Sequence, residues 1–314
     1  MAASDRPVPV VLSIAGSDSG GGAGIQADLK AFAAAGVHGV TAITALTAQS
    51  TVGVSAVEAV SPAMVEAQVD AVAGDLGVDA VKIGMLGDVA TIEAVARALD
   101  RLPAGTPVVH DPVMVAESGA RLLPEAATAA LIEYVLPRAT VITPNLPEAR
   151  ALVEEGVRGA GAGAPEGARG DQHAPSERAG APADDLDGQA LVRALHVLGP
   201  AVVVVTGGHR DEVIDLVFDG VRLDELAGER HPDGAAHGSG CTHSATLAAH
   251  LALGSTPLEA ARAAREASGA AVRDGLRGLG AGAGPVDVLG LTRAAAVRAK
   301  TRRATPPSGA RPLP

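Results

Sequence analysis

The sequence contains a single cysteine, Cys241, among 314 residues. One cysteine cannot form a disulfide within the chain, and one thiol makes a zinc site only with several neighbouring histidines or carboxylates. Cys241 is therefore either a small buried side chain or a reactive thiol. A redox-sensing role ranks low, because an oxidised thiol would find no second cysteine to resolve it.

Aromatic side chains are scarce: there is no tryptophan, one tyrosine and two phenylalanines. Any ring that the protein binds must pack on aliphatic side chains and main chain, and the stacking platforms of single-strand nucleic-acid binders cannot be built. The net charge is −11 with no block of Lys or Arg, which argues against nucleic acid or an anionic membrane as a partner. An anionic substrate would need a local electropositive pocket.

No run of about 18 uncharged apolar residues is present, and residues 1–9 lack the cationic and apolar regions of a signal peptide. The sequence therefore predicts a soluble, cytoplasmic protein. With 47% hydrophobic residues the chain can bury a large core, and a single domain over residues 1–300 is the simplest organisation. The Pro-rich residues 301–314 are predicted to form a flexible tail.

Short runs rich in Val and Ile alternate with longer Ala/Leu segments at helical spacing, which predicts an α/β fold with a mostly parallel sheet flanked by helices. Residues 156–185 are mainly Gly, Ala, Pro and charged residues and cannot bury enough apolar surface to offset their ordering entropy, so we predict a disordered insertion. The predicted strands are Val8–Ile14, Val40–Leu46, Val54–Val60, Asp79–Ile83, Pro107–Asp111, Ala139–Thr143, Ala201–Val205 and Val213–Phe218. The predicted helices are Ile25–Ala35, Pro62–Asp75, Val89–Leu102, Pro124–Leu136, Pro147–Glu155, Leu186–Leu198, Thr242–Leu253 and Pro257–Leu276.

A Gly-rich segment, Gly238–Thr242, directly precedes an apolar predicted helix. Gly238 and Gly240 let the main chain turn its N–H groups inward, and the helix dipole adds partial positive charge, as in an anion site. That position should also lower the pKa of the Cys241 thiol. Taken alone, the segment equally suits an ordinary helix start with a buried cysteine. The Walker A pattern Gly-x-x-x-x-Gly-Lys-Ser/Thr is absent from the chain.

The first loop, residues 16–24, is also rich in glycine. It resembles a dinucleotide fingerprint only loosely, because Ile25 stands where a third glycine would be expected and no acidic residue ends a second strand. An oxidoreductase of the Rossmann type is therefore disfavoured, and a flexible turn before a helix is the plainer alternative.

Polar residues follow three of the predicted strands: Asp111, the segment Thr143–Glu148, and the segment Thr206–His209. The ends of parallel strands meet at one edge of a sheet, so these groups should lie together. Phosphoryl transfer needs a carboxylate that holds a metal ion, donors to phosphate and a base near the acceptor oxygen. Each cluster alone could be a solvated turn, but their joint placement favours a kinase.

The order of these segments resembles the phosphomethylpyrimidine kinase family, the thiamine branch of the ribokinase-like fold. The resemblance implies a three-layer α/β fold, ATP over the loop Gly238–Thr242, and an enzyme that phosphorylates hydroxymethylpyrimidine and then its monophosphate with ATP and Mg²⁺. The matching segments are Ser13–Asp18, Gln26–Lys30, Ala45–Gln49, Lys82–Leu86, Asp111–Met114, Thr143–Ala149 and His237–Thr242.

By position in the family pattern, Asp28 and Gln49 are expected to contact the pyrimidine, in a pocket lined by Gly16, Met85 and Val113. Cys241 stands where sugar kinases of the broader fold carry an aspartate base. We predict that Cys241 accepts the hydroxymethyl proton, while the amides of Gly238, Ser239 and Gly240 hold the transferring oxygens.

Glu148, with Asp111 as second choice, is the expected Mg²⁺ carboxylate. Lys82, Asn145 and Thr242 are expected on the phosphate side of ATP. Many relatives carry lysine where this chain has Thr206, so a hydroxyl donor replaces an expected positive charge.

Pyridoxal or pyridoxine kinase is the main alternative function, because the same scaffold hosts it and the two rings differ by few contacts. A protein that binds ATP without turnover is a second alternative. The resemblance also implies a homodimer.

Overall fold

The computed structural model describes residues 6–115, 123–162, 187–207, 213–232 and 234–304. Within these ranges, nine strands form one sheet in the order β3-β2-β1-β4-β5-β6-β7-β8-β9. β2, β1 and β4 to β7 are parallel, whereas β3, β8 and β9 pair antiparallel with their neighbours. The mostly parallel sheet is confirmed. Its strands are β1 (Val10–Asp18), β2 (His38–Ser50), β3 (Gly53–Ala59), β4 (Ala80–Ile83), β5 (Val108–His110), β6 (Val141–Ile142), β7 (Val202–Val205), β8 (Val213–Phe218) and β9 (Leu223–Gly228).

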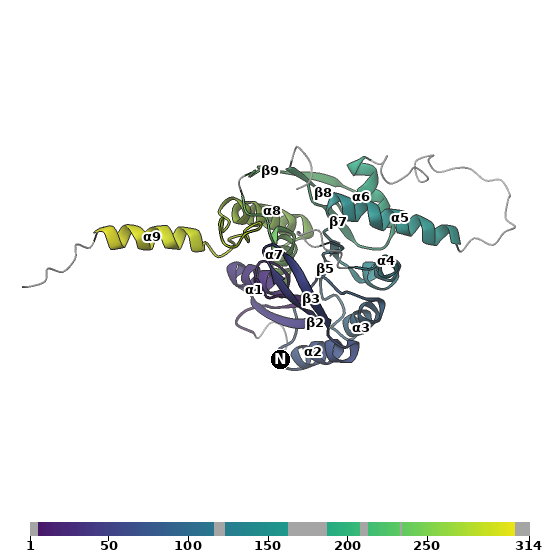
Figure 1. The fold of residues 1–314 in the computed structure, drawn as a ribbon. Coiled ribbons are helices and arrows are strands. Elements are labelled where there is room, and N and C mark those ends of the chain that lie inside the picture. The colour runs from purple at the N-terminus through teal and green to yellow at the C-terminus, as the bar shows by residue number, and fades with distance from the viewer. Residues whose placement is uncertain (1–5, 116–122, 163–186, 208–212, 233, 305–314) are drawn as a thin grey trace, which may run out of the picture.

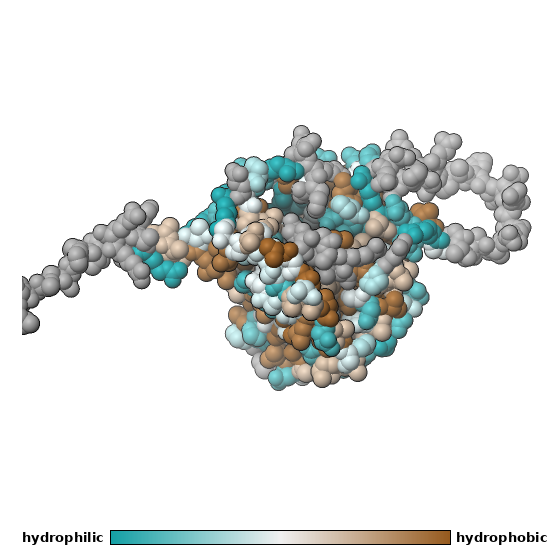
Figure 2. All heavy atoms as spheres, in the orientation of Figure 1, coloured by the Kyte–Doolittle hydropathy of each residue, from teal (hydrophilic) through white to brown (hydrophobic). Residues whose placement is uncertain are grey.

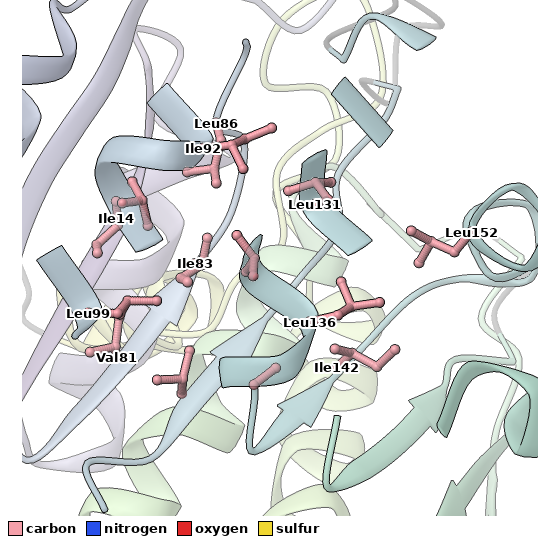
Figure 3. Close-up of a cluster of buried hydrophobic side chains, with 14 of the residues drawn as sticks. Ile14, Val81, Ile83, Leu86, Ile92, Leu99, Leu131, Leu136, Ile142 and Leu152 are labelled. Carbon is pink, nitrogen blue, oxygen red and sulfur yellow. The ribbon is translucent and has the colours of Figure 1, made fainter. Parts of the chain in front are cut away.

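Helices cover both faces of this sheet (Figure 1). Alternate residues of a strand point to opposite faces, so Leu12 and Ile14 enter one core and Val11 the other. The first core, part of which Figure 3 shows, packs against α2 to α6, and the second against α1, α7 and α8. The helices are α1 (Gly24–Ala35), α2 (Pro62–Asp75), α3 (Val89–Leu99), α4 (Glu125–Ala130), α5 (Leu146–Ala162), α6 (Gly188–Val197), α7 (Ser239–Ala252), α8 (Pro257–Arg273) and α9 (Leu291–Ala304).

The helix ends follow local sequence signals. Asp88 accepts a hydrogen bond from the amide of Thr91 and so caps α3. Thr256 and Glu259 form a reciprocal capping box at the start of α8. Gly36, in the left-handed conformation, ends α1. These caps explain why the predicted and observed boundaries of most helices agree closely.

Two boundaries differ from the prediction. The helix α5 continues to Ala162, inside the segment predicted as an insertion from residue 156, and Arg158 pairs with Glu155 one turn earlier to support it. The helix α9, which projects from the body in Figure 1, reaches Ala304 where the tail was predicted to begin at residue 301. Residues 163–186 and 305–314 of these two predictions lie outside the described residues.

Two further elements differ from those predicted. The edge strand β9 was missed because only Leu226 in it is buried, so its sequence lacks an apolar strand signal. The predicted helix over residues 124–136 is continuous in the chain but changes form, from α4 to a π-helical turn (Leu131–Val135) and a 3-10 turn (Leu136–Arg138). In the described part of the chain, no helix combines the length and apolar character that a membrane span needs.

Candidate active site

A cavity of about 450 Å³ lies at the carboxyl ends of the parallel strands. Residues that follow β1, β4, β5, β6 and β7 line it together with the first turn of α7. This is the crevice in which open α/β sheets bind ligands. Of the predicted site residues, all but Asp28 and Thr242 lie on its wall: Gly16, Gln49, Lys82, Met85, Asp111, Val113, Asn145, Glu148, Thr206, Gly238, Ser239, Gly240 and Cys241.

The first loop is folded around the carboxylate of Asp18. One oxygen of Asp18 accepts the amide of Gly20 at 2.8 Å, and the other accepts the amides of Gly22 and Ala23 at 3.0 and 2.8 Å. Burial would raise the pKa of Asp18, but a hydrogen bond from His237 and these amides lower it below its usual value. The glycine-rich turn thus binds the chain's own carboxylate and leaves those three amides unavailable to a phosphate.

The predicted acceptor pocket is assembled at one end of the cavity. Gly16, Gln49, Met85 and Val113 all reach its wall. A Cβ atom on Gly16 would lie 2.4 Å from Cε of Met85, so Met85 packs directly against this glycine, and a larger residue there would displace the end of the Met85 side chain. The Thr47 hydroxyl lies 3.1 Å from the side-chain oxygen of Gln49 and helps to orient that amide.

Asp28 lies behind this pocket. Its carboxylate accepts the Ser13 hydroxyl at 2.6 Å and forms an ion pair with Nζ of Lys82 at 2.9 Å, and neither Asp28 nor Lys82 is exposed. Burial would lower the pKa of Lys82, but the surrounding negative charges, that of Asp28 foremost, and the hydrogen bond to Asp28 together outweigh it and raise that pKa. Lys82 reaches the cavity wall and Asp28 does not, so a direct contact of Asp28 with a pyrimidine stays a prediction.

The loop before α7 has the geometry of an anion cradle. Gly238 has a φ of +84°, and a Cβ atom there would lie 1.7 Å from the carbonyl oxygen of Gly22. The amide of Ser239 donates to the carbonyl of Ala236, whereas Gly240 and Cys241 fall at first-turn positions whose amides have no acceptor within a helix. Thr242, predicted as an ATP contact, is fully buried beneath this turn.

The predicted lowering of the Cys241 pKa is wrong. Burial raises the pKa of the Cys241 thiol to about 12. Lys82 and the amide of Gly24 act in the opposite direction, but the charges of Asp28 and Asp111 add to the burial. The helix dipole favours a lower pKa, but desolvation and the two carboxylates, which come from distant segments, outweigh it. The thiol is therefore protonated at neutral pH.

Two carboxylates on the cavity wall, those of Asp111 and Glu148, interact electrostatically. Asp111 accepts the Ser244 hydroxyl at 3.0 Å, and Glu148 accepts the Asn145 amide at 3.0 Å while the Asn145 side chain accepts the Glu148 amide at 2.9 Å. The second arrangement is a capping box at the start of α5. Burial, and then the charge of Asp111, raise the pKa of Glu148 to about 8.

This carboxylate pair suits a magnesium ion. The charges of Asp111 and Glu148 oppose each other, and a divalent cation would relieve that repulsion. Among the described residues, no group of three or more His, Cys, Asp or Glu could hold a metal by itself. Mg²⁺ commonly uses one or two carboxylates and completes its shell with waters and substrate phosphates.

Several lining residues were not predicted as site residues, among them His237, Asp215, His243 and Arg265. From β8, Asp215 accepts the amide of Gly207 at 2.8 Å and lies 3.4 Å from Nε2 of His243. Only His237 had a sequence signal, because it directly precedes Gly238. The predicted cluster after β7 is present through Thr206 and Gly207, and its residues 208 and 209 lie outside the described residues.

The three-layer fold, with a helix-start anion loop and two carboxylates at the carboxyl edge of the sheet, is that of the ribokinase-like small-molecule kinases. A family model described as phosphomethylpyrimidine kinase matches residues 18–162 and 180–287. The chain belongs to this family.

Individual relatives agree with this assignment. A hydroxymethylpyrimidine/phosphomethylpyrimidine kinase of Rhizobium meliloti is 48% identical over 280 residues, which are 88% of this chain and 96% of that protein. The crystal structure of phosphomethylpyrimidine kinase from Clostridium difficile has 34% identity and a TM-score of 0.64 over 82% of this chain and 96% of that one. Pyridoxal kinase from Staphylococcus aureus, in complex with AMP-PCP and pyridoxal, has 31% identity and a TM-score of 0.73 over 90% of this chain and 94% of that one.

Proposed function

We propose that this protein is an ATP-dependent kinase that phosphorylates hydroxymethylpyrimidine, and then its monophosphate, to the diphosphate used in thiamine biosynthesis. The observation that carries the proposal is the meeting of a pocket lined by Gly16, Gln49 and Met85 with the anion loop at Gly238 in one cavity. The family match and the names of the curated relatives support the same substrate.

In this proposal the hydroxymethyl oxygen attacks the γ-phosphorus of ATP and ADP leaves. The first-turn amides of Gly240 and Cys241 donate to the transferring oxygens, and Lys82 adds positive charge at the wall. Glu148 and Asp111 would hold Mg²⁺, which supplies charge neutralisation on the phosphates when bound. The nucleoside of ATP occupies the end lined by Asp215, His243 and Arg265.

We propose Cys241 as the group that takes the hydroxymethyl proton. Its thiol starts protonated, so this role requires that the partly exposed thiol first release its own proton to solvent and then, as the thiolate, accept the proton of the attacking hydroxymethyl group. A Cys241→Ala variant should lose roughly 100-fold in kcat. Full turnover of Cys241→Ser across a pH profile would exclude the role.

Pyridoxal kinase is the second candidate, because the Staphylococcus aureus enzyme that binds pyridoxal has the same architecture. The two are separated by incubating the protein with Mg-ATP and either hydroxymethylpyrimidine or pyridoxal, and following products by mass spectrometry. Mono- and diphosphates of the pyrimidine support the first proposal. Phosphorylation of pyridoxal alone would move the function to vitamin B6 salvage.

We also propose that residues 1–300 act as one kinase domain, that it works in the cytoplasm, and that it forms a homodimer. The single continuous sheet supports the first statement.

The proposed dimer is supported by the edge strand β3 and its neighbour β2. In these strands Leu46 and Val57 are 50% and 54% exposed. Hydrophobic residues gather over this part of the surface in Figure 2. Light scattering on the purified protein tests the stoichiometry.

A further inference from the structure

Two loops that are 219 residues apart in the chain are joined by one pair of side chains. Nε2 of His237 lies 3.0 Å from Oδ2 of Asp18. Both residues are more than nine-tenths buried, at 7% and 2% relative exposure, and both line the main cavity. Since the carboxylate of Asp18 also accepts amides of its own loop, Nε2 of His237 must be the donor in this contact.

The loops touch through glycines around this pair. A Cβ atom on Gly22 would lie 2.0 Å from Cδ2 of His237, and one on Gly238 would lie 1.7 Å from the carbonyl oxygen of Gly22. The main chain of His237 is tied in turn to a third segment, since its amide donates to the carbonyl of Gly284 and its carbonyl accepts the amide of Val286. The mutual position of the loops is therefore set by close main-chain contact and by the polar link between Asp18 and His237.

Asp18 adjoins the acceptor pocket, and His237 adjoins the anion loop. Asp18 stands two residues after Gly16, in the loop that lines the acceptor pocket. His237 directly precedes Gly238, where the anion loop begins. The amide of Gly24, from the Asp18 loop, also interacts with the Cys241 thiol. A shift of either loop would thus move the acceptor relative to the phosphate cradle.

We infer that Asp18 and His237 are a positioning pair, which fixes the distance between the acceptor hydroxyl and the transferring phosphate. The inference rests on the proposed kinase function. Reacting atoms must approach to about 3 to 3.5 Å, and a misplacement of about 1 Å can cost on the order of 100-fold in rate. In this inference the pair acts through Gly16 and Gly238 and does not itself exchange protons with the reacting atoms.

The test compares His237→Leu, which removes the donor, with His237→Gln, whose side-chain NH₂ falls near the position of Nε2. The purified full-length variants are assayed with Mg-ATP and hydroxymethylpyrimidine. We expect His237→Leu to lose about 30- to 100-fold in kcat, with KM for both substrates changed less than about threefold, because binding surfaces persist while their alignment is lost. His237→Gln should retain most of the wild-type kcat.

Asp88→Ala is the matched control, because it removes the cap of α3 without touching either loop. It should lower the melting temperature and leave kcat unchanged. A wild-type kcat in His237→Leu, with or without a lower melting temperature, would overturn the inference. An equal loss of kcat in His237→Leu and His237→Gln would also overturn the inference, because it would show that the packing of the imidazole ring, and not its hydrogen bond, sets the rate. A wild-type protein that makes no product would instead reject the proposed function, and the inference with it.

Discussion

Nζ of Lys82 lies 2.9 Å from Oδ1 of Asp28, and neither side chain is exposed. The pair joins β4 to α1 beneath the cavity, with the Ser13 hydroxyl of β1 as a further donor to Asp28. Two charges that are taken fully out of water are tolerated only when they are paired and hydrogen-bonded, as these are. Lys82 therefore reaches the cavity as a cation whose position Asp28 holds.

Breaking this pair should cost both stability and activity. A Lys82→Ala variant leaves the carboxylate of Asp28 buried without its partner, which we expect to lower the free energy of unfolding by about 3 to 5 kcal/mol. Urea denaturation measures this loss. The double variant Asp28→Asn/Lys82→Met removes both charges and should recover much of the stability while activity stays low. Equal stability of the single and double variants would show that the charge pairing is not the cause.

Cys241 should react slowly with iodoacetamide at neutral pH. The thiolate is the reactive form, and with a pKa of about 12 only about one thiol in ten thousand is ionised at pH 8. The rate should rise about tenfold per pH unit above pH 8, whereas that of a free thiol levels off near its ordinary pKa of about 8.5. Mass spectrometry of the single modified site follows the reaction, with Cys241→Ser as the blank. Rapid alkylation at pH 7 that does not depend on pH would contradict the raised pKa.

The sequence predicted the layers of the fold well because their signals are local. Val202–Val205 is an unbroken apolar run, and Pro62 after Ser61 marks a helix start, so β7 and α2 could be placed from the sequence alone. β9 gave no such signal, because an edge strand exposes most of its side chains.

The candidate site was predicted less completely, because its electrostatics depend on residues from distant segments. The glycines before an apolar helix located the loop that holds Cys241. The direction in which the pKa of Cys241 shifts, however, depends on burial and on the charges of Asp28 and Asp111. Similarly, nothing in the segments that hold Asp18 and His237 predicts that the two residues pair, and only the tertiary structure brings them within 3.0 Å. A contact between segments that are distant in the chain leaves no pattern in the local sequence of either segment.

Glu148→Gln separates the proposed metal role from the helix cap. Glutamine can still accept the Asn145 amide, so the capping box and the melting temperature should be nearly preserved. The Mg²⁺ concentration for half-maximal rate should rise about tenfold, because a neutral ligand replaces an anionic one. Glu155→Gln, farther along the same helix, is the control and should behave as wild type. An unchanged Mg²⁺ requirement in Glu148→Gln would reject the metal assignment.

His110 makes the folded protein sensitive to acid. In the described structure both of its ring nitrogens are buried, and burial, followed by the charge of Lys82, lowers its pKa from 6.5 to about 3, although an interaction with the backbone of Ile83 acts in the opposite direction. Between these values the unfolded chain binds a proton that the folded protein does not, so stability falls as the pH drops from 6.5 towards 3. His110→Leu, of similar volume, should flatten this part of the stability curve in thermal melts at pH 4 to 7. An unchanged slope would mean that other groups control the acid response.

Gly238 should tolerate no side chain. Its φ of +84° disfavours an L-residue, and a Cβ atom would meet the carbonyl oxygen of Gly22 at 1.7 Å, so the anion loop and the first loop would have to separate. We expect Gly238→Ala to lose at least about 100-fold in kcat, because the phosphate cradle moves away from the acceptor pocket. Gly74→Ala is the control: Gly74 lies in α2, a Cβ atom there would have no neighbour within 4 Å, and alanine should stabilise the protein by roughly 0.5 to 1 kcal/mol with unchanged kcat. Wild-type turnover in Gly238→Ala would mean that the contact between the loops is not needed for the reaction.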